Sequence, residues 1–452
     1  MSHGAYAIST DPDSGKKIFA ENACPGDILE LEIYDERKDF SFAHITELVS
    51  KSDLREEDPK CKLHKICGSC QWQHIKYEEQ LNFKKQNLLD LLKQNQVDLS
   101  NFGDLDENIS VTGLDDPWHY RNKVIYPVSS VKSTGRVMAG YYKRKSNDLI
   151  NIKYCPIQYE IFDQVIDRLK ELCTEYGIHD PLLRHMLLRA SHDQSELLIS
   201  FIVRGKLLSE ADLEAIEKIF EQIYGEYEQL KVCTLNINDD STNVILGKET
   251  RLVKGERDFI YDQIKDVKVK ISTSSFFQIN NKQFTNILDS IIGYVKEIKP
   301  LQVLDAYAGL GSISLNLAKS LPEMKFEAFE INSSAVADAH ENILENELNN
   351  LNYIEASAED YFRSLEAEFD LIILNPPRKG CTNKVLNEIV ARDEVKDIVY
   401  LSCNPATLAR DIKYLEKKSD FVLQSIKAFD MFPHSFHLES LVWLSRATDS
   451  NL

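Results

Sequence analysis

The chain has 452 residues, of which 43% are hydrophobic and 28% charged, and its formal net charge is -19. The length exceeds the size at which a single core stops growing, so we expect two or three domains; the acidic balance excludes a protein that holds nucleic acid by bulk electrostatics. No apolar run approaches the ~20 residues of a membrane span, and residues 1–17 lack the apolar core of a signal peptide, which predicts a cytoplasmic protein without a membrane partner.

Residues 1–50 alternate short β-like runs with turn signals such as Asp-Pro-Asp at 11–13 and Pro-Gly-Asp at 25–27. The runs are residues 17–19, 28–34 and 42–48. This pattern predicts a small β-barrel or sheet. It fits a purely structural β-module and an OB-like RNA-binding module equally well.

Three cysteines, Cys61, Cys67 and Cys70, lie within ten residues, and Cys155 follows at a distance. Thiolates are the soft ligands that select zinc or iron–sulfur, so the grouping favours a metal site over unrelated buried cysteines. The spacing matches neither the paired motif of a zinc ribbon nor a ferredoxin run, and it leaves the metal open. Residues 71–94 then show the apolar periodicity of a long helix.

Residues 100–270 are rich in β-branched and aromatic runs, which predict a β-rich region. The runs are residues 124–131, 138–142, 187–188, 197–203 and 232–237. Basic and aromatic residues alternate in one part of this region, an arrangement that suits phosphate contacts and base stacking. They are Arg121, Lys123, Lys132, Arg136, Lys143, Arg144 and Lys145, with Trp118, Tyr120, Tyr126, Tyr141 and Tyr142. A solvated basic edge is the alternative, and we favour RNA because the chain as a whole is acidic.

From about residue 271 onward, apolar runs alternate with helical patterns, which predicts a parallel or mostly parallel doubly wound sheet. The expected strands are residues 303–307, 326–331, 369–374, 397–401 and 441–444. Ligands of such sheets bind at the carboxyl ends of the strands.

A glycine turn follows the first of these strands. Gly309 and Gly311 permit close approach of a ligand to the backbone, and Glu330, 19 residues after Gly311, can accept hydrogen bonds from a ribose. The third glycine of the dinucleotide fingerprint is absent. An adenosyl ligand without a pyrophosphate fits better, which favours S-adenosylmethionine over NAD.

Asn375 opens an Asn-Pro-Pro loop at the end of the third strand, and two prolines make this loop rigid. Methyltransferases that act on the amino group of adenine carry a similar Asn-Pro-Pro followed by an aromatic residue. Here Arg378 follows instead. This difference weakens the prediction of amine methylation.

Cys403 stands at the end of the fourth strand, in VYLSCNPATLAR. A buried structural thiol is the commoner role for a lone cysteine. Methylation of uridine C5 gives Cys403 another role, because a thiolate that adds to C6 makes C5 nucleophilic and a base must then remove the C5 proton. Cys403 can supply the thiolate and Glu439, before the fifth strand, the base. A surface carboxylate is the alternative for Glu439.

Seven segments together resemble a known family, the RNA 5-methyluridine methyltransferases. In chain order they read KCKLHKICGSCQWQHIKYEEQL, WHYRNKV, SSFFQINNKQF, LDAYAGLGS, NPPRKG, YLSCNPATLARD and DMFPHSFHLE. The resemblance covers nearly the whole chain and lies closest to the group that methylates 23S ribosomal RNA.

The resemblance implies particular roles for ten residues. Cys403 would be the nucleophile and Glu439 the proton-abstracting base. S-adenosyl-L-methionine would be bound by Gln278, Tyr307, Glu330 and Asn375. A [4Fe-4S] cluster would be held by Cys61, Cys67, Cys70 and Cys155.

The expected fold is α/β, a Rossmann-like methyltransferase domain with a β-rich central RNA-binding domain and a small N-terminal OB-like module of the TRAM type. The expected boundaries are 1–55 for the TRAM-like module, 56–270 for the iron–sulfur and RNA-binding region, and 271–452 for the methyltransferase domain. We expect the helix at 71–94 to pack on the methyltransferase domain and the protein to be a monomer.

Two positions depart from the family pattern. Asn375 stands where the family usually has Asp, which removes a charge next to the cofactor and the target base, and Ser69 replaces a usual Gly between two cysteines. The leading hypothesis is uridine-C5 methylation of ribosomal RNA. The alternatives are the same chemistry on tRNA, and a non-catalytic RNA-binding or assembly factor that retains the fold.

Overall fold

The computed structural model describes residues 1, 4, 6–364 and 367–447. The chain divides into two compact units, one made of Met1–Pro117 together with Pro376–Leu452 and the other of Trp118–Asn375. In the described residues, no helix combines the length and the apolar character that a membrane crossing requires.

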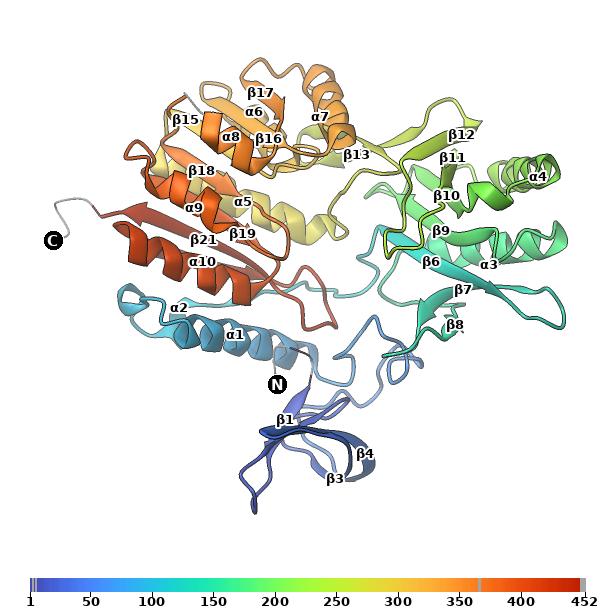
Figure 1. The fold of residues 1–452 in the computed structure, drawn as a ribbon, viewed down its shortest axis with the longest axis horizontal. Coiled ribbons are helices and arrows are strands. Elements are labelled where there is room, and N and C mark those ends of the chain that lie inside the picture. The colour runs from blue at the N-terminus through green and yellow to red at the C-terminus, as the bar shows by residue number, and fades with distance from the viewer. Residues whose placement is uncertain (2–3, 5, 365–366, 448–452) are drawn as a thin grey trace. The chain divides into compact units, whose positions relative to one another are not determined.

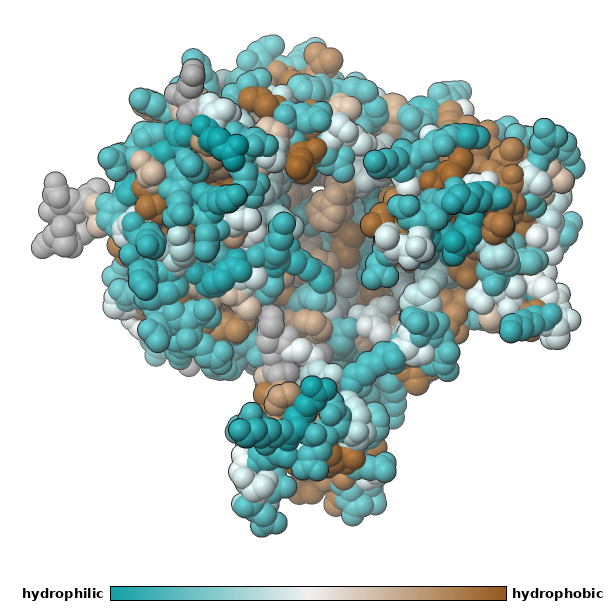
Figure 2. Space-filling model, in the orientation of Figure 1, coloured by the Kyte–Doolittle hydropathy of each residue, from teal (hydrophilic) through white to brown (hydrophobic). Residues whose placement is uncertain are grey.

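A four-stranded sheet in the order β1-β2-β4-β3 opens the first unit. Its strands are β1 (Ala7–Thr10), β2 (Lys17–Ala20), β3 (Ile28–Glu36) and β4 (Phe40–Ser50). The three predicted strands are confirmed, and β1 adds a fourth. Figure 2 shows hydrophobic side chains at the surface of this N-terminal sheet. The exposed large aliphatic residues of the sheet are Ile8, Ile28, Ile33 and Val49.

Helix α1 (Tyr77–Gln94) begins six residues later than the sequence pattern predicts. Residues 71–76 instead form turns around Trp72, whose side chain is fully buried. Leu88, Leu89 and Leu92 form the buried apolar face of the helix. In Figure 1, α1 runs beside α10 (Pro405–Lys418), and the two helices contact each other.

The remaining strands of the first unit lie in the order β19-β21-β20-β5. They are β5 (Val111–Thr112), β19 (Asp397–Ser402), β20 (Phe421–Phe429) and β21 (Glu439–Arg446), accompanied by α2 (Leu105–Asn108) and α9 (Asn383–Val390). The strand expected at 441–444 is part of β21. It pairs antiparallel with both β19 and β20. The short loop that joins β20 to β21 requires their antiparallel pairing, since a parallel pair would need a crossover.

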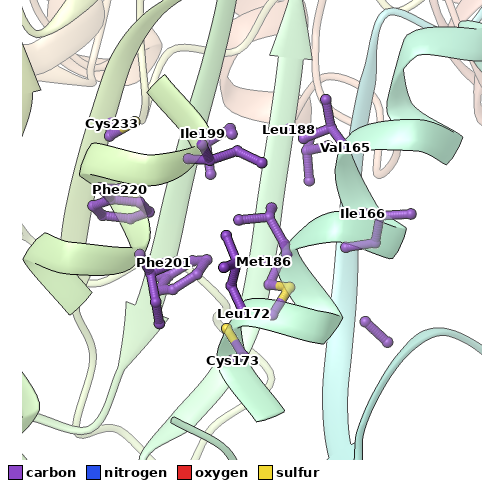
Figure 3. Close-up of a cluster of buried hydrophobic side chains, with 14 of the residues drawn as sticks. Val165, Ile166, Leu172, Cys173, Met186, Leu188, Ile199, Phe201, Phe220 and Cys233 are labelled. Carbon is purple, nitrogen blue, oxygen red and sulfur yellow. The ribbon is translucent and has the colours of Figure 1, made fainter. Parts of the chain in front are cut away.

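The second unit contains a seven-stranded sheet in the order β12-β11-β10-β9-β6-β7-β8, as the β-rich pattern predicts. Its strands are β6 (Lys123–Ser130), β7 (Val137–Tyr142), β8 (Leu149–Asn151), β9 (Leu183–Ala190), β10 (Leu197–Val203), β11 (Leu230–Ile237) and β12 (Glu249–Gly255). Helices α3 (Glu160–Glu175) and α4 (Glu210–Glu226) bury their apolar faces against it. Figure 3 shows this core, with Leu172 of α3, Met186 of β9 and Phe201 of β10 among its buried side chains.

The second unit also contains four parallel strands in the order β17-β16-β15-β18. They are β15 (Gln302–Ala306), β16 (Lys325–Glu330), β17 (Leu351–Glu355) and β18 (Leu371–Leu374). The helices are α5 (Asn281–Ile298), α6 (Ser312–Ser320), α7 (Ser333–Glu345) and α8 (Ala358–Ser364), and β13 (Phe259–Ile264) pairs with β14 (Val267–Ser272) as a hairpin. The expected alternation of parallel strands with helices is confirmed.

Candidate active site

Cys403 and Glu439 lie at the ends of two paired strands in the first unit. Strand β19 ends at Ser402, which pairs with Ser440 in the antiparallel register with β21. Continuation of that register by one residue sets Cys403 opposite Glu439. Directly opposed residues of an antiparallel pair project their side chains from the same face, about 5 Å apart at Cβ. The fold therefore brings the candidate nucleophile and the candidate base together.

The electrostatics of these two groups are coupled. Burial raises the pKa of the Cys403 thiol, and the nearby Glu439 carboxylate raises it further. Burial also raises the pKa of Glu439, to about 8, and only 6% of this residue is exposed. Cys403 is only half-buried. The site therefore holds a partly accessible thiol beside a carboxyl group that is mostly protonated below pH 8 and mostly ionised above it.

Arg378 is the basic group of this site, and the sequence pattern did not assign it a role. It donates a hydrogen bond to Cys403, and its positive charge lowers the pKa of both Cys403 and Glu439. These contacts favour the thiolate and the carboxylate, the two forms that addition to C6 and proton removal require.

The start of α10 holds the backbone of Arg378. Asn404, which caps α10, donates its side-chain amide to the Arg378 carbonyl at 2.9 Å, and the Thr407 hydroxyl donates to the same carbonyl at 3.3 Å. Asn404 thus caps the helix that follows Cys403 and also holds the loop that carries Arg378. These two roles of Asn404 explain why the motif NPATLARD begins with asparagine.

Asp411 of α10 holds the next residues of the same loop. Its buried carboxylate accepts hydrogen bonds from the Cys381 backbone amide at 2.9 Å and from the Tyr400 hydroxyl at 2.8 Å, and it pairs with Arg410. Gly380 has φ +74°, and a Cβ there would stand 2.5 Å from Asp411 Oδ2. Only glycine fits this position without rearrangement.

In the second unit, three of the predicted cofactor residues emerge side by side from parallel strands. Ala306 pairs with Phe329 of β16 and with Leu374 of β18. The residues that follow Ala306, Phe329 and Leu374 are Tyr307, Glu330 and Asn375. All three therefore lie at the carboxyl ends of adjacent strands, where α/β sheets bind ligands.

The glycine turn and Glu330 suit an adenosyl ligand. Glu330 accepts hydrogen bonds from the backbone amides of Gly309 at 3.1 Å and of Ile331 and Asn332, both at 2.9 Å, which fix the carboxylate in place. A carboxylate has about four acceptor positions, so capacity remains for a ribose hydroxyl. Tyr307 has φ +62°, an unusual conformation for a residue with a side chain, and a Cβ at Gly309 would meet no atom within 4 Å.

Asp305 is a further polar group of this region that the sequence pattern did not single out. It is 1% exposed, and burial raises its pKa to about 7. Its Oδ2 accepts from the Ser314 amide at 3.1 Å, whereas Oδ1 has no hydrogen-bond partner among the described residues. A buried acceptor of this kind fits a ligand that supplies a donor. Its position two residues before Tyr307 is the feature of the sequence that could have indicated a role near the cofactor.

Gln278, the fourth predicted cofactor residue, lies in the loop between β14 and α5. Its carbonyl accepts a hydrogen bond from the buried Asn122 side chain at 2.9 Å, and the Asn122 amide donates to the Ile279 carbonyl at 3.1 Å. The buried Arg189 guanidinium donates to the Ser275 carbonyl of the same loop at 2.7 Å. Asn122, which belongs to the WHYRNKV motif, therefore helps to hold the loop that carries Gln278.

Of the four cysteines of the expected cluster, Cys67, Cys70 and Cys155 are buried and Cys61 is partly exposed. Burial is the main cause of the raised pKa of Cys61, and the charge of Cys67 raises this pKa further. The two cysteines therefore lie near each other. Their soft donor chemistry suits iron–sulfur or zinc. Across the part of the chain that the structure describes, however, no three His, Cys, Asp or Glu side chains are arranged to hold a metal ion.

The basic and aromatic segment at 118–145 is divided between surface and core. Lys132, Arg136, Lys143 and Lys145 are exposed, and Tyr142 is 43% exposed. The rings of Tyr120 and Tyr126 are buried, and the Tyr126 hydroxyl donates to Gln158. The expectation that these two tyrosines present faces for base stacking is therefore wrong, because they pack in the core.

Known proteins resemble this chain along nearly its whole length. A family model described as tRNA (uracil-5-)-methyltransferase matches residues 76–447. An uncharacterized RNA methyltransferase of Bacillus cereus is 34% identical over 440 residues, which cover 95% of this chain and 92% of that protein. One of Clostridium tetani is 33% identical over 439 residues, with 95% and 91% covered.

Among solved structures, the Pyrococcus abyssi tRNA (uracil-54, C5)-methyltransferase in complex with S-adenosyl-L-homocysteine superimposes with a TM-score of 0.73. It is 25% identical, and the match covers 97% of this chain and 100% of that chain.

Proposed function

The chain belongs to the RNA uracil-C5 methyltransferase family, and from this premise we propose that it methylates uridine C5 of ribosomal RNA, with 23S rRNA as its substrate. It is an S-adenosylmethionine-dependent RNA (uracil-5-)-methyltransferase. The pairing that sets Cys403 opposite Glu439 carries the proposed mechanism. The N-terminal sheet and the cysteine block, both of which resemble the 23S group, support the choice of ribosomal RNA.

The first step of the proposed mechanism forms a bond between Cys403 and uridine C6. Arg378 favours the Cys403 thiolate, whose electron pair attacks C6, so that C5 becomes enolate-like. Bound S-adenosylmethionine supplies an electrophilic methyl group. Tyr307, Glu330 and Asn375 would hold it at the carboxyl ends of their strands, together with Gln278. C5 then carries both the methyl group and its original hydrogen.

The second step regenerates the enzyme. Glu439 accepts the C5 proton, the electrons of the C–H bond re-form the C5–C6 double bond, and the S–C6 pair returns to Cys403. Burial holds the pKa of Glu439 near 8, so the carboxylate is a stronger base than an exposed glutamate would be. Proximity of the base to the thiol follows from the register of β19 and β21.

We also propose that Cys61, Cys67, Cys70 and Cys155 hold a [4Fe-4S] cluster. The soft donor chemistry of the four cysteines and the family resemblance support this assignment. In the proposed mechanism, neither step uses the cluster, whose role would be to organise the RNA-binding region.

A tRNA substrate is the second candidate. The Pyrococcus abyssi enzyme acts on tRNA at uracil 54, and its match with this chain extends over 97% of the sequence. The N-terminal sheet and the cysteine block therefore do not by themselves exclude tRNA. The alternative of a non-catalytic assembly factor is not retained, because the comparisons identify the chain as an RNA (uracil-5-)-methyltransferase.

Mapping of 5-methyluridine in total rRNA and tRNA, from cells with and without this gene, tests the substrate. The proposal expects loss of 5-methyluridine from 23S rRNA alone. Loss from tRNA alone would assign the second candidate, and no loss from either RNA would contradict both.

A further inference from the structure

The loop of residues 430–438 connects β20 to β21 and ends directly before Glu439. The last residue of β20, Phe429, pairs with Glu439, the first residue of β21. The loop therefore closes a hairpin whose final pair contains the proposed base. Any change in the path of the loop acts on Glu439 through the backbone.

A buried ion pair holds the beginning of this loop. Lys84 of α1 donates from Nζ to Asp430 Oδ1 at 2.5 Å and to the Phe432 carbonyl at 3.2 Å. Neither the Lys84 nor the Asp430 side chain is exposed to solvent. A lone buried charge is costly, so each group depends on the other. Lys84 thus binds the loop through Asp430, although the two residues lie 346 positions apart in the sequence.

A strained residue in the middle of the loop is held from the same side. His434 has φ +66°, a conformation that costs free energy for a residue with a side chain. Its carbonyl accepts from the backbone amides of Gln71 at 3.0 Å and of Trp72 at 2.9 Å. Its own amide donates to Gln80 Oε1 at 3.0 Å.

Gln80 contacts both the turns at residues 71–76 and the loop at His434. Its Nε2 donates to the carbonyls of Trp72 at 3.0 Å and Ile75 at 2.9 Å, and lies 3.3 Å from His434 Nδ1. Burial lowers the pKa of His434 to about 3, so the ring stays neutral. Phe436 also packs against the cluster that contains Trp72. The segment directly after Cys70 and the first turns of α1 therefore fix the loop.

We propose that Lys84 and Gln80 are positioning residues for the Glu439 base, which they place by holding the 430–438 loop. This inference rests on the proposed function. Neither residue needs to touch the RNA or the cofactor. The step that depends on them is removal of the C5 proton, whereas attack by Cys403 and methyl transfer precede it.

The order of steps gives the test a specific signature. A misplaced base leaves the S–C6 bond intact after methyl transfer, so the covalent protein–RNA adduct accumulates. A variant that is merely less folded loses adduct and product together. Adduct measured on a denaturing gel, relative to product, separates a positioning role from a general loss of structure.

The experiment uses the full-length protein with 23S rRNA fragments and radiolabelled S-adenosylmethionine. Lys84→Met and Gln80→Leu are compared with Lys93→Met, which alters an exposed lysine at the end of the same helix. We expect turnover of Lys84→Met and Gln80→Leu to fall by roughly tenfold or more while methylated adduct accumulates, as for Glu439→Gln. Lys93→Met is expected to match the wild type.

Because Lys84→Met leaves Asp430 without its cation, the double variant Lys84→Met/Asp430→Asn supplies a better-folded test. Thermal unfolding and S-adenosylmethionine binding establish that each variant is folded. Wild-type turnover in the folded variants, or loss of adduct in proportion to product, overturns the proposal. Absence of adduct in Glu439→Gln would instead contradict the proposed function.

Discussion

Arg378 donates a hydrogen bond to Cys403, and the same guanidinium lowers the pKa of Glu439. One basic side chain therefore favours the reactive forms of both proposed catalytic groups. Arg378 follows the Pro-Pro turn that begins the C-terminal part of the first unit, and Asn404 and Thr407 fix its carbonyl. The position of the charge is set by α10, the helix that follows Cys403.

Substitution of Arg378 by Gln is expected to shift the pH–rate profile to higher pH. Loss of the cation raises the pKa of Cys403 and Glu439, so a smaller fraction of each is ionised at neutral pH. The rate of adduct formation, measured across a pH series in single-turnover experiments, checks this. Lys379→Gln, at the exposed neighbouring position, is the control and is expected to keep the wild-type profile. An unshifted profile in Arg378→Gln would contradict a role for the Arg378 charge in ionising Cys403 and Glu439.

The pH dependence of stability tests the burial of Glu439. Its pKa rises from 4.5 to about 8 in the folded protein, so the unfolded chain ionises first and the free energy of unfolding falls as pH rises between these values. Below 4.5 this contribution is fully present. Glu439→Gln cannot ionise, and we expect its Tm advantage over the wild type to be larger at about pH 8 than at about pH 5. An equal difference at both pH values would contradict a raised pKa.

Substitution of Asp411 by Ala is expected to lower the free energy of unfolding by about 3 kcal/mol, because its buried carboxylate accepts several hydrogen bonds. The loop that carries Arg378 would lose its support at Cys381. Chemical denaturation measures the change. Asp420→Ala, which removes a half-exposed carboxylate paired with Arg446, is a control for loss of a carboxylate near the surface. A loss below about 1 kcal/mol would show that the network contributes little.

Replacement of Cys61 or Cys70 by Ser is expected to remove iron and acid-labile sulfide from anaerobically purified protein, since a cluster needs all its thiolates. Cys173→Ala, which changes a cysteine buried in the core of the central sheet, is expected to keep both. Iron and sulfide analyses supply the measurement. Full iron content in both Ser variants would overturn the proposed cluster, and zinc in place of iron would identify a different metal.

Much of the fold follows from the sequence, because buried strands and amphipathic helices have regular patterns. The strands that end at Ala306, Glu330, Leu374 and Ser402 were predicted within three residues at either end. Among the strands after residue 300, β17 and β20 lie outside the predicted runs. In β20 (Phe421–Phe429), exposed and buried positions alternate irregularly, because a register shift interrupts the pairing.

The candidate site was predictable where residues follow strand ends and less so where distant residues meet. Cys403 and Glu439 belong to motifs, whereas the antiparallel pairing that sets them opposite depends on the β20–β21 hairpin. Lys84 has the pattern of an exposed helical lysine, and its burial depends on Asp430, far away in the chain. Arg378 gave no signal because its role depends on how α10 folds against its loop.

The most direct test of the mechanism is tritium release from [5-³H]uridine-labelled 23S rRNA incubated with S-adenosylmethionine. Methylation at C5 displaces the tritium, so the wild type is expected to release it. Cys403→Ala should release none and form no covalent adduct, while remaining folded and able to bind S-adenosylmethionine. Tritium release by Cys403→Ala at the wild-type rate would contradict the assignment of Cys403 as the nucleophile.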